Sequence, residues 1–396
     1  MKAKIQNPGN SFSFVCDAAR MAEALTRVLS VTAFSSASEG EKHHVMMAYK
    51  GGVYIVGYSP ETFVAVQLKV DDKPTTSGCF EFDISALQGL IKRRAGLEFI
   101  YNNNSLTLKA LKGKYTCELK TIEVTQEIIP RINKSLNSQA EGDSLSAAEL
   151  HSLKDAVAHC SINEIYLEEK DKSLLCYITF NKGIMTVSAM DNFHMAHYKA
   201  KVKSKSKFRL ALSSSMFTLI SKFVSEESEE ATFSLSSKGL VVGGNNFLVT
   251  LPPTQVEDSH FELVPMFLKQ NSKGVCEFTL PQTAFDTIDN MKSLAKNDEK
   301  FIFALNEKGV VKLTIETDNG IVSDAFKAKD STNTKKRKWN IDPRIFFDLY
   351  KKIRTLKTDI PMSLHGSANG SDSSAFFITR MKLSKTSSVT LVGTYE

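Results

Sequence analysis

The 396-residue sequence lacks the short motifs that mark several common classes of enzyme and metal protein. It contains no nucleophile-elbow pattern GxSxG, no phosphate-binding GxxxxGK[ST] and no zinc-protease HExxH. Its six cysteines are scattered, and no two of them form a CxxC pair. We therefore expect no structural zinc site, and scattered thiols fit a reducing cytosol better than a disulfide framework. The sequence predicts no metal, no cofactor and no enzymatic activity.

Long apolar runs are also missing. No stretch of about 18 apolar residues occurs, so no membrane-spanning helix is expected. Residues 1–10 lack the apolar segment of a signal peptide, and we expect a cytoplasmic protein. A content of 42% hydrophobic and 24% charged residues is typical of a soluble globular protein. The net charge of +6 is compatible with a polyanionic partner without identifying one.

The chain contains an internal threefold repeat. Three segments open with a short alternating strand and continue with apolar residues at helical spacing. The opening strands end near Phe14, Leu145 and Leu280, which lie 131 and 135 residues apart. A second strand-helix pattern begins in each third near residues 80, 208 and 339, and further strands follow it.

The repeat predicts the fold class and the domain boundaries. Each third has strand-like runs around a lysine-glycine turn, where Gly52, Gly183 and Gly309 are expected to take a positive φ. Polar stretches at 135–142 and 269–274 separate the thirds. We predict an α+β protein of three tandem domains, 1–138, 139–270 and 271–396, each built from two strand-helix-strand halves. Chance similarity among ordinary α+β segments is the alternative.

This organisation resembles that of the bacterial-type DNA polymerase sliding clamp, the polymerase III beta subunit family. The resemblance covers the full length, but it lies in the order of elements more than in residue identity. This favours a divergent member of the family, of the kind that a bacteriophage encodes. In that family two protomers join head to tail into a ring of six domains. Helices line the hole around double-stranded DNA, and sheets form the outer wall. The resemblance implies a DNA-clamp fold and a processivity factor that binds polymerase and clamp loader.

The segment AMDNFHMA, residues 189–196, is the best local match, because the family carries a pattern close to ATDGHRLA in its middle domain. In the family this segment borders a hydrophobic pocket between the middle and last domains, where partner proteins insert short linear motifs. The resemblance implies a pocket formed by Tyr166, Leu167, Met190, Asn192, Phe193, Met195, Pro252, Val256, Val389 and Leu391.

The same segment raises a metal or catalytic alternative through Asp191, His194 and His197. A spacing of three suits two ligands on one helix face. This segment has a strand pattern, however, and residues three apart on a strand point to opposite faces. A shared metal is therefore disfavoured, and an enzyme that uses Asp191 and His194 is kept as an alternative function.

Basic residues concentrate in two repeat-equivalent linkers and on several predicted helices. Because duplex DNA is uniformly anionic, such a set is expected to bind it without sequence preference. The predicted DNA-binding residues are Arg20, Arg27, Lys92, Arg93, Arg94, Lys199, Lys201, Lys203, Lys205, Lys207, Lys335, Lys336, Arg337, Lys338, Lys351, Lys352 and Arg354.

The resemblance also implies a homodimer whose seam joins the first domain of one protomer to the last domain of the other. The edge strand KYTCELK would supply Tyr115, Cys117 and Leu119, and a helix of the last domain would supply Met291 and Leu294. A trimeric clamp is disfavoured, because six domains require two chains of three. A β-rich structural or adhesion repeat protein is the remaining alternative.

Overall fold

The structure is a computed structural model that describes residues 11–394 with internal gaps. The gaps are 138–142, 161–174, 191–193, 204–206, 225–229, 237–238, 253–255, 295–299, 318–319, 333–335, 342, 355–357 and 366–375. Within the described ranges, no helix is long and apolar enough to cross a membrane.

The same order of elements occurs three times, as the sequence predicts: a strand, a helix, four strands, a helix and three strands. The first repeat contains β1 (Ser11–Asp17), α1 (Ala18–Thr32), β2 (His43–Tyr49), β3 (Gly52–Tyr58), β4 (Phe63–Leu68), β5 (Gly78–Glu81), α2 (Ile84–Ile91), β6 (Gly96–Asn102), β7 (Ser105–Ala110) and β8 (Thr116–Lys120). Helix α3 (Ile128–Asn137) connects it to the second repeat.

The second repeat follows the same plan. It contains β9 (Asp143–Ser146), α4 (Ala147–Cys160), β10 (Leu175–Asn181), β11 (Ile184–Met190), β12 (His194–Lys201), β13 (Phe208–Ser213), α5 (Ser214–Val224), β14 (Glu230–Ser236), β15 (Gly239–Gly243) and β16 (Phe247–Leu251). Helix α6 (His260–Gln270) then leads to the third repeat.

The third repeat completes the chain. Its elements are β17 (Cys276–Leu280), α7 (Phe285–Leu294), β18 (Lys300–Leu305), β19 (Val310–Thr317), β20 (Gly320–Lys327), β21 (Arg337–Ile341), α8 (Pro343–Arg354), β22 (Ile360–His365), β23 (Phe376–Lys382) and β24 (Ser387–Thr394). The α+β class predicted from the sequence is confirmed.

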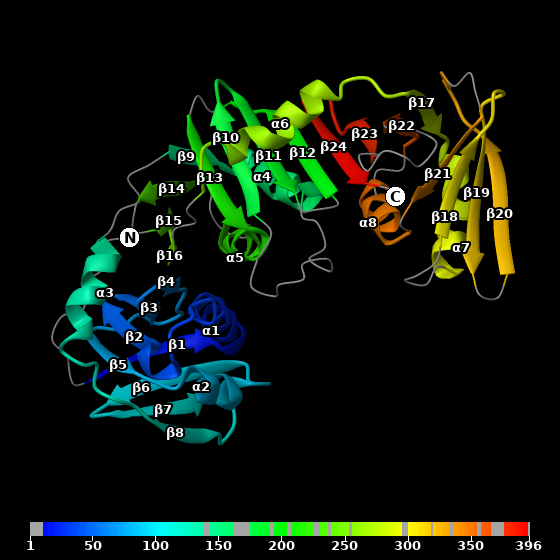
Figure 1. Ribbon diagram of the computed structural model, residues 1–396. Coiled ribbons are helices and arrows are strands. Elements are labelled where there is room, and N and C mark those ends of the chain that lie inside the picture. Colours follow the sequence, from blue (N-terminus) through cyan, green and yellow to red (C-terminus); the bar gives the residue numbers. More distant parts are fainter. Residues whose placement is uncertain are drawn as a thin grey trace. The chain divides into compact units, whose positions relative to one another are not determined.

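The strands form antiparallel sheets in two compact units, residues 1–151 with 216–254 and residues 152–215 with 255–396 (Figure 1). The first unit has an eight-stranded sheet, β5-β2-β3-β4-β16-β15-β14-β9, and a four-stranded sheet, β1-β6-β7-β8. The second has an eight-stranded sheet, β13-β10-β11-β12-β24-β23-β22-β17, and a four-stranded sheet, β20-β19-β18-β21. Each eight-stranded sheet thus joins half-sheets of two different repeats, at β4–β16 and at β12–β24. The division into three domains stays a prediction.

Tight turns set the register of one hairpin in each repeat. Gly51, Gly183 and Gly309 take φ values of +74°, +75° and +73°, which glycine adopts without strain. The sequence-based choice of Gly52 is wrong by one residue, because Gly51 takes the left-handed conformation and Gly52 already belongs to β3. The other two glycines are as predicted.

Helices cover both faces of the first unit's large sheet because its strands are apolar on both sides. Helix α1 begins after Asp17, whose carboxylate accepts hydrogen bonds from the backbone N–H groups of Ala19 (2.8 Å) and Arg20 (3.2 Å). It packs against β3 and β4. Helix α3 packs on the opposite face through buried residues that include Ile132 and Leu136. We call the face covered by α1 the helix face.

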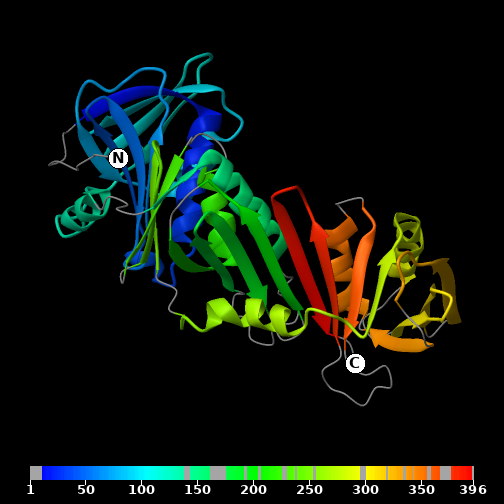
Figure 2. The same ribbon diagram turned by 90° about the horizontal axis from the view of Figure 1, so that it is seen from above.

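The second unit is built in the same way (Figure 2). On its helix face, Tyr198 of β12 stacks on His159 of α4, with ring centroids 6.1 Å apart. On the opposite face, α6 packs against β10, β11 and β12. The rings of Phe261 and Tyr177 meet there edge to face at 5.5 Å. In the last repeat the aromatic core joins β18 to α8, whose Phe346 lies 5.1 Å from Phe301.

Met291 of α7 is a core residue, with 1% of its surface exposed. The interface role predicted for it is therefore wrong, because a side chain enclosed by its own repeat cannot contact a second protomer. The side chain of Leu294 lies outside the described residues.

Burial gives a direct prediction for Met291. Met291→Ala should lower the free energy of unfolding by about 2–5 kcal/mol, through lost transfer energy and a residual cavity. Met291→Glu should unfold the last repeat, because it buries a carboxylate without a partner. The measurement is urea unfolding followed by circular dichroism. Val275→Glu is the control, since Val275 is 50% exposed. Equal stability of Met291→Glu and the control would contradict the assignment to the core.

Candidate functional site

The hairpin of β11 and β12 carries the segment that best matches the clamp pattern. Its strands pair from Ile184↔Lys201 to Met190↔Met195. His194 is buried at 1% exposure, while His197 points to the other face, where its Nδ1 lies 2.8 Å from the Ser188 hydroxyl. The two histidines diverge, as the strand pattern predicts. No group of three metal-ligating side chains gathers anywhere in the described ranges, and Asp191 lies outside them.

Only part of the predicted pocket lies in the described chain. Met190 and Met195 are half-buried on neighbouring strands, and Pro252 and Val256 are half-buried in their segments. Val256 packs against the cluster of Tyr177, Ala211 and Phe261 beside α6. The other members, Tyr166, Leu167, Asn192 and Phe193, lie outside the described residues.

Val389 and Leu391 do not lie on a surface. Both are 1% exposed on β24, an interior strand between β12 and β23. They pair with Tyr198 and Ala196, so they share the helix face with Tyr198. Their predicted role in a peptide pocket is wrong, because both side chains belong to the core beneath the helices.

Two exposed apolar residues on α6 were missed by the sequence reasoning. Leu263 is 42% exposed and Met266 is 55% exposed, and they lie three residues apart on one side of the helix. Helix α3, the corresponding connection in the first unit, buries Ile128, Ile129, Ile132 and Leu136. Among the described helices, only α6 exposes large apolar side chains. The signal in the sequence is the apolar run LVPMFL, residues 263–268. A helix that buries only one face does not need so many consecutive apolar residues.

The predicted DNA-binding residues fall on opposite faces of the sheets. Lys199 and Lys201 alternate with Tyr198 on β12, so they point away from the helix face. Lys338 alternates with Trp339, whose strand neighbour Phe303 contacts Phe346 of α8, so Lys338 also points away from the helices. Lys203, Lys207 and Lys336 are exposed in connections. The described part of the chain does not include Lys205, Lys335 or the side chain of Arg337.

The residues of that set that lie on helices or just after them behave differently. Arg20, Lys92, Arg93, Arg94, Lys351 and Arg354 are exposed. Arg27 is bound to Glu23 and lies 6.0 Å from the ring of Phe223. Lys352 is half-buried. The sequence could not separate these two groups, because helical and strand periodicity define faces without saying which face carries the helices.

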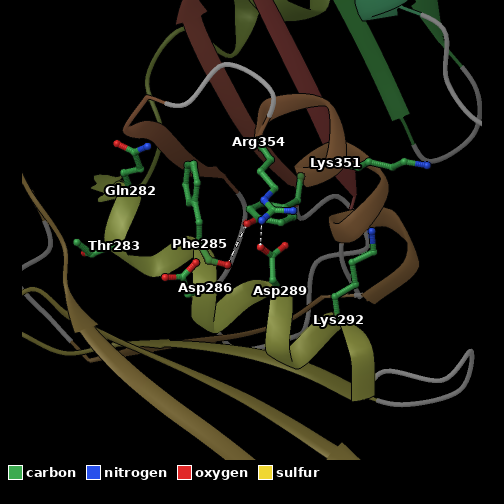
Figure 3. Close-up of a pocket in the computed structure, with 9 residues that line it drawn as sticks. Gln282, Thr283, Phe285, Asp286, Asp289, Lys292, Lys351 and Arg354 are labelled. Carbon is green, nitrogen blue, oxygen red and sulfur yellow. Dashed lines mark hydrogen bonds and ion pairs between the residues drawn. The ribbon is translucent and has the colours of Figure 1, made fainter.

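A cleft of about 810 Å³ lies between α7 and α8 (Figure 3). Asp286, Asp289 and Lys292 line it from α7, and Lys351 and Arg354 from α8. Arg354 forms an ion pair with Asp289, and Lys351 extends away from the cluster. The hydroxyl of Tyr350 donates to the carbonyl of Phe285 (3.1 Å). Burial, followed by the charge of Asp289, raises the pKa of Tyr350, so its hydroxyl stays protonated and does not act as a base.

Comparison with known proteins shows the fold. No protein-family model matches the sequence, and no curated protein is similar to it in sequence. Among solved structures, the sliding clamp of Bacillus subtilis is 14% identical, with 98% of this chain and 99% of that chain covered and a TM-score of 0.74. The beta subunit of DNA polymerase III from Thermotoga maritima is 12% identical over 97% and 99%, with a TM-score of 0.73. The clamp of Pseudomonas aeruginosa, solved with griselimycin bound, is 13% identical over 98% and 100%, with a TM-score of 0.72.

The chain has the fold of a bacterial sliding clamp. The architectural resemblance inferred from the sequence is confirmed at this level, and the match extends over nearly the whole length of both chains.

The clamp fold of this chain has two sheet edges of particular interest, β8 and β20. On β8, Cys117 and Leu119 are half-buried, as is Tyr115 just before the strand. The Tyr115 hydroxyl donates to the carbonyl of Leu90 in α2 (3.0 Å), so these side chains lie on the face of the four-stranded sheet that α2 covers. Strand β20 is exposed along almost its whole length, including Ile321 (71%) and Val322 (39%). The sequence analysis predicted an interface role for β8 and none for β20. The apolar pair Ile321 and Val322, directly after Gly320, is the signal in the sequence that indicates β20.

The environment of His197 predicts a pH dependence of stability. Burial, followed by the charge of Lys199, lowers the pKa of His197 to about 4 from 6.5. The His197 imidazole therefore binds a proton near pH 6.5 in the unfolded chain but only near pH 4 in the folded protein. This contribution to the free energy of unfolding is present above pH 6.5 and is lost as pH falls through that window, by on the order of 3 kcal/mol.

The test is urea unfolding at pH 7.5 and pH 4.5 for wild type and His197→Gln. The loss between the two pH values should be smaller in the variant, since its side chain does not titrate. An equal loss in both proteins would show that other buried histidines carry the whole effect.

Proposed function

We propose that the protein is a DNA polymerase processivity factor: two copies form a ring that encircles duplex DNA and binds polymerase and other partners through an apolar surface. The proposal rests on the clamp fold and on one observation in particular. The chain joins its half-sheets by antiparallel pairs between two equivalent strand positions of successive repeats. In the described residues, β8 and β20 occupy these two positions without a partner and lie at sheet edges.

The repeat makes these two edges complementary. The third strand of the four after the first helix is β4, β12 and β20 in the successive repeats. The last strand of the repeat is β8, β16 and β24. Strand β4 pairs with β16, and β12 pairs with β24. The remaining combination is β20 with β8, and a second copy supplies it twice, which closes a head-to-tail ring. The partner of β8 is then β20 rather than the buried Met291.

Covering two open edges by each other also removes a liability. An exposed strand edge with apolar side chains is a template for unwanted pairing. Ile321 and Val322 leave β20 in that condition in a single copy.

The first test is the oligomeric state. Wild type should have a mass in solution of about twice 43.9 kDa. Ile321→Glu combined with Val322→Glu should give monomers that remain folded, because both side chains are exposed in the single chain and would be buried between copies. Light scattering after size exclusion measures the mass. Met266→Glu, at an apolar position on α6 that is 55% exposed, is the control and should stay dimeric. A monomeric wild type, or a dimeric double variant, contradicts the ring.

We place DNA contacts on the helix face rather than on the lysine linkers. The exposed cations there include Lys222 of α5 and Lys351 of α8, neither of which has a carboxylate partner in the described part of the chain. The linker lysines Lys199 and Lys338 point to the opposite face. Phosphate contacts of this kind give affinity without sequence preference.

A pair of double variants separates the two locations. Lys222→Gln with Lys351→Gln should weaken binding to linear duplex and lower the slope of log affinity against log salt by about 1 for each lost phosphate contact. Lys199→Gln with Lys338→Gln removes the same charge and should change little. Fluorescence anisotropy at several salt concentrations measures both. The reverse ranking would return the DNA contacts to the linkers.

For partner proteins we propose the exposed side of α6 with the adjacent strand surface. Leu263 and Met266 are accessible, and Met195 lies on the β12 face that α6 packs against. A few apolar anchors in such a surface carry most of the binding energy of a short peptide, and methionines adapt to several peptides.

Met266→Lys and Met195→Lys should each weaken binding of the polymerase's peptide by tenfold or more, since a buried lysine opposes apolar contact. Calorimetric titration of the peptide measures this. The dimeric state should not change, and the Ile321→Glu/Val322→Glu protein should still bind the peptide. Unchanged affinity in both methionine variants would place the partner surface elsewhere.

A further inference from the structure

The repeat identifies equivalent side chains at each junction between half-sheets. On the strand, the position fifteen residues after the positive-φ glycine is Val66 in β4, Tyr198 in β12 and Asp324 in β20. The second helix of the next repeat also supplies an equivalent position, the tenth residue when its first helical residue is counted as one. This residue is Phe223 in α5, Lys352 in α8 and, just after the end of the shorter α2, Arg93. The first two pairs lie at junctions within the chain.

At the β4–β16 junction these positions are apolar and buried. Val66 is 5% exposed and pairs with Phe247 of β16. The ring of Phe223 lies 5.5 Å from the ring of Phe247. The helix position therefore packs over the strand position through one shared aromatic ring.

At the β12–β24 junction the same two positions again converge. Tyr198 is 3% exposed and stacks on His159. Lys352 lies close enough for its charge to add to burial in lowering the pKa of His159. The equivalence by counting thus has a spatial counterpart at both junctions within the chain.

The third pair consists of Asp324, on the edge strand β20, and Arg93, just after α2. The carboxylate of Asp324 accepts hydrogen bonds from the Thr287 hydroxyl of α7 (2.6 Å) and from the backbone N–H of Ala325 (2.7 Å). These bonds, the one from Thr287 first, lower the pKa of Asp324, so the exposed group is ionised. In the described chain no cation forms an ion pair with it.

The arginine side is also held in place. Arg93 has a φ of +63° just after the end of α2, and Arg94 follows it. The guanidinium group of Arg94 lies 3.8 Å from the centre of the Tyr115 ring, beside β8. Both arginines are exposed, and within the described ranges neither forms an ion pair. A carboxylate held at β20 thus has a counterpart in two exposed arginines after α2, of which Arg94 is held against Tyr115.

We propose that Asp324 of one copy forms an ion pair with Arg93 and Arg94 of the second copy, so that opposite charges meet at the seam between copies, whereas no carboxylate stands at the equivalent positions of the two junctions within each chain. This rests on the proposed ring and adds its chemistry. Because such a pair lies at an accessible surface, it is weakened by salt. The ring should therefore open at this seam, while β4–β16 and β12–β24 hold.

Mixing two charge-reversed chains tests the pairing. One chain carries Asp324→Arg, and the other carries Arg93→Glu and Arg94→Glu. Each alone would place like charges at both seams and should raise the dimer dissociation constant at least tenfold. In a mixed dimer both seams are of opposite charge, one native and one reversed. Mixing should restore the dissociation constant to within about threefold of wild type, since complementary charges recover the lost attraction.

Sedimentation velocity at 50 and 500 mM salt measures the constants, with one chain fluorescently labelled to identify mixed dimers. Asp286→Arg, an exposed carboxylate of α7, is the matched control and should dimerise as wild type does. Circular dichroism confirms that each variant is folded. If wild type is dimeric and either reversed chain dimerises normally, or if mixing restores nothing, the ion pair is wrong. If wild type is monomeric, the ring itself is wrong.

Discussion

Antiparallel pairing between strands of different repeats is the constraint on which the rest of this structure depends. Every backbone N–H and C=O group at a sheet edge needs a partner or water. The chain supplies partners by joining β4 to β16 and β12 to β24. Because these pairs connect half-sheets of successive repeats, they also decide which helices lie side by side and which surface each repeat presents. Among the described strands at the positions that form these junctions, β8 and β20 have no counterpart within the chain.

The large features of the fold could be predicted from the sequence because they are periodic. Alternation predicted the strands, and the separation of His194 from His197 follows from it directly. Helical spacing and the positive-φ glycines marked the repeat. Periodicity does not tell which neighbour covers a face, however. Val389 and Leu391 looked like surface anchors and are core, and Met291 looked like an interface residue and is core.

The faces of the sheets separate two kinds of chemistry. In the second unit, the side that carries α7 and α8 has the exposed cation Lys351 and the mixed cleft of Asp289 and Arg354. The opposite face carries α6, where Leu263 and Met266 remain accessible. The linker lysines could not be assigned from sequence, since a strict alternation such as Lys199 and Lys201 fixes a common side but not the identity of that side. Only the position of Tyr198 against α4 resolves it.

The middle repeat is divided between the two compact units, and this has a consequence for synthesis on the ribosome. The first unit takes residues 216–254 after an excursion through 152–215 into the second. The edge of β4 is therefore unpaired until β16, residues 247–251, has left the exit tunnel, and β12 waits for β24 near the end of the chain. Such long-range pairs form slowly, and open edges are exposed to aggregation meanwhile. The first unit can therefore complete its large sheet only when residues up to 251 are available, and the second only when β24 is.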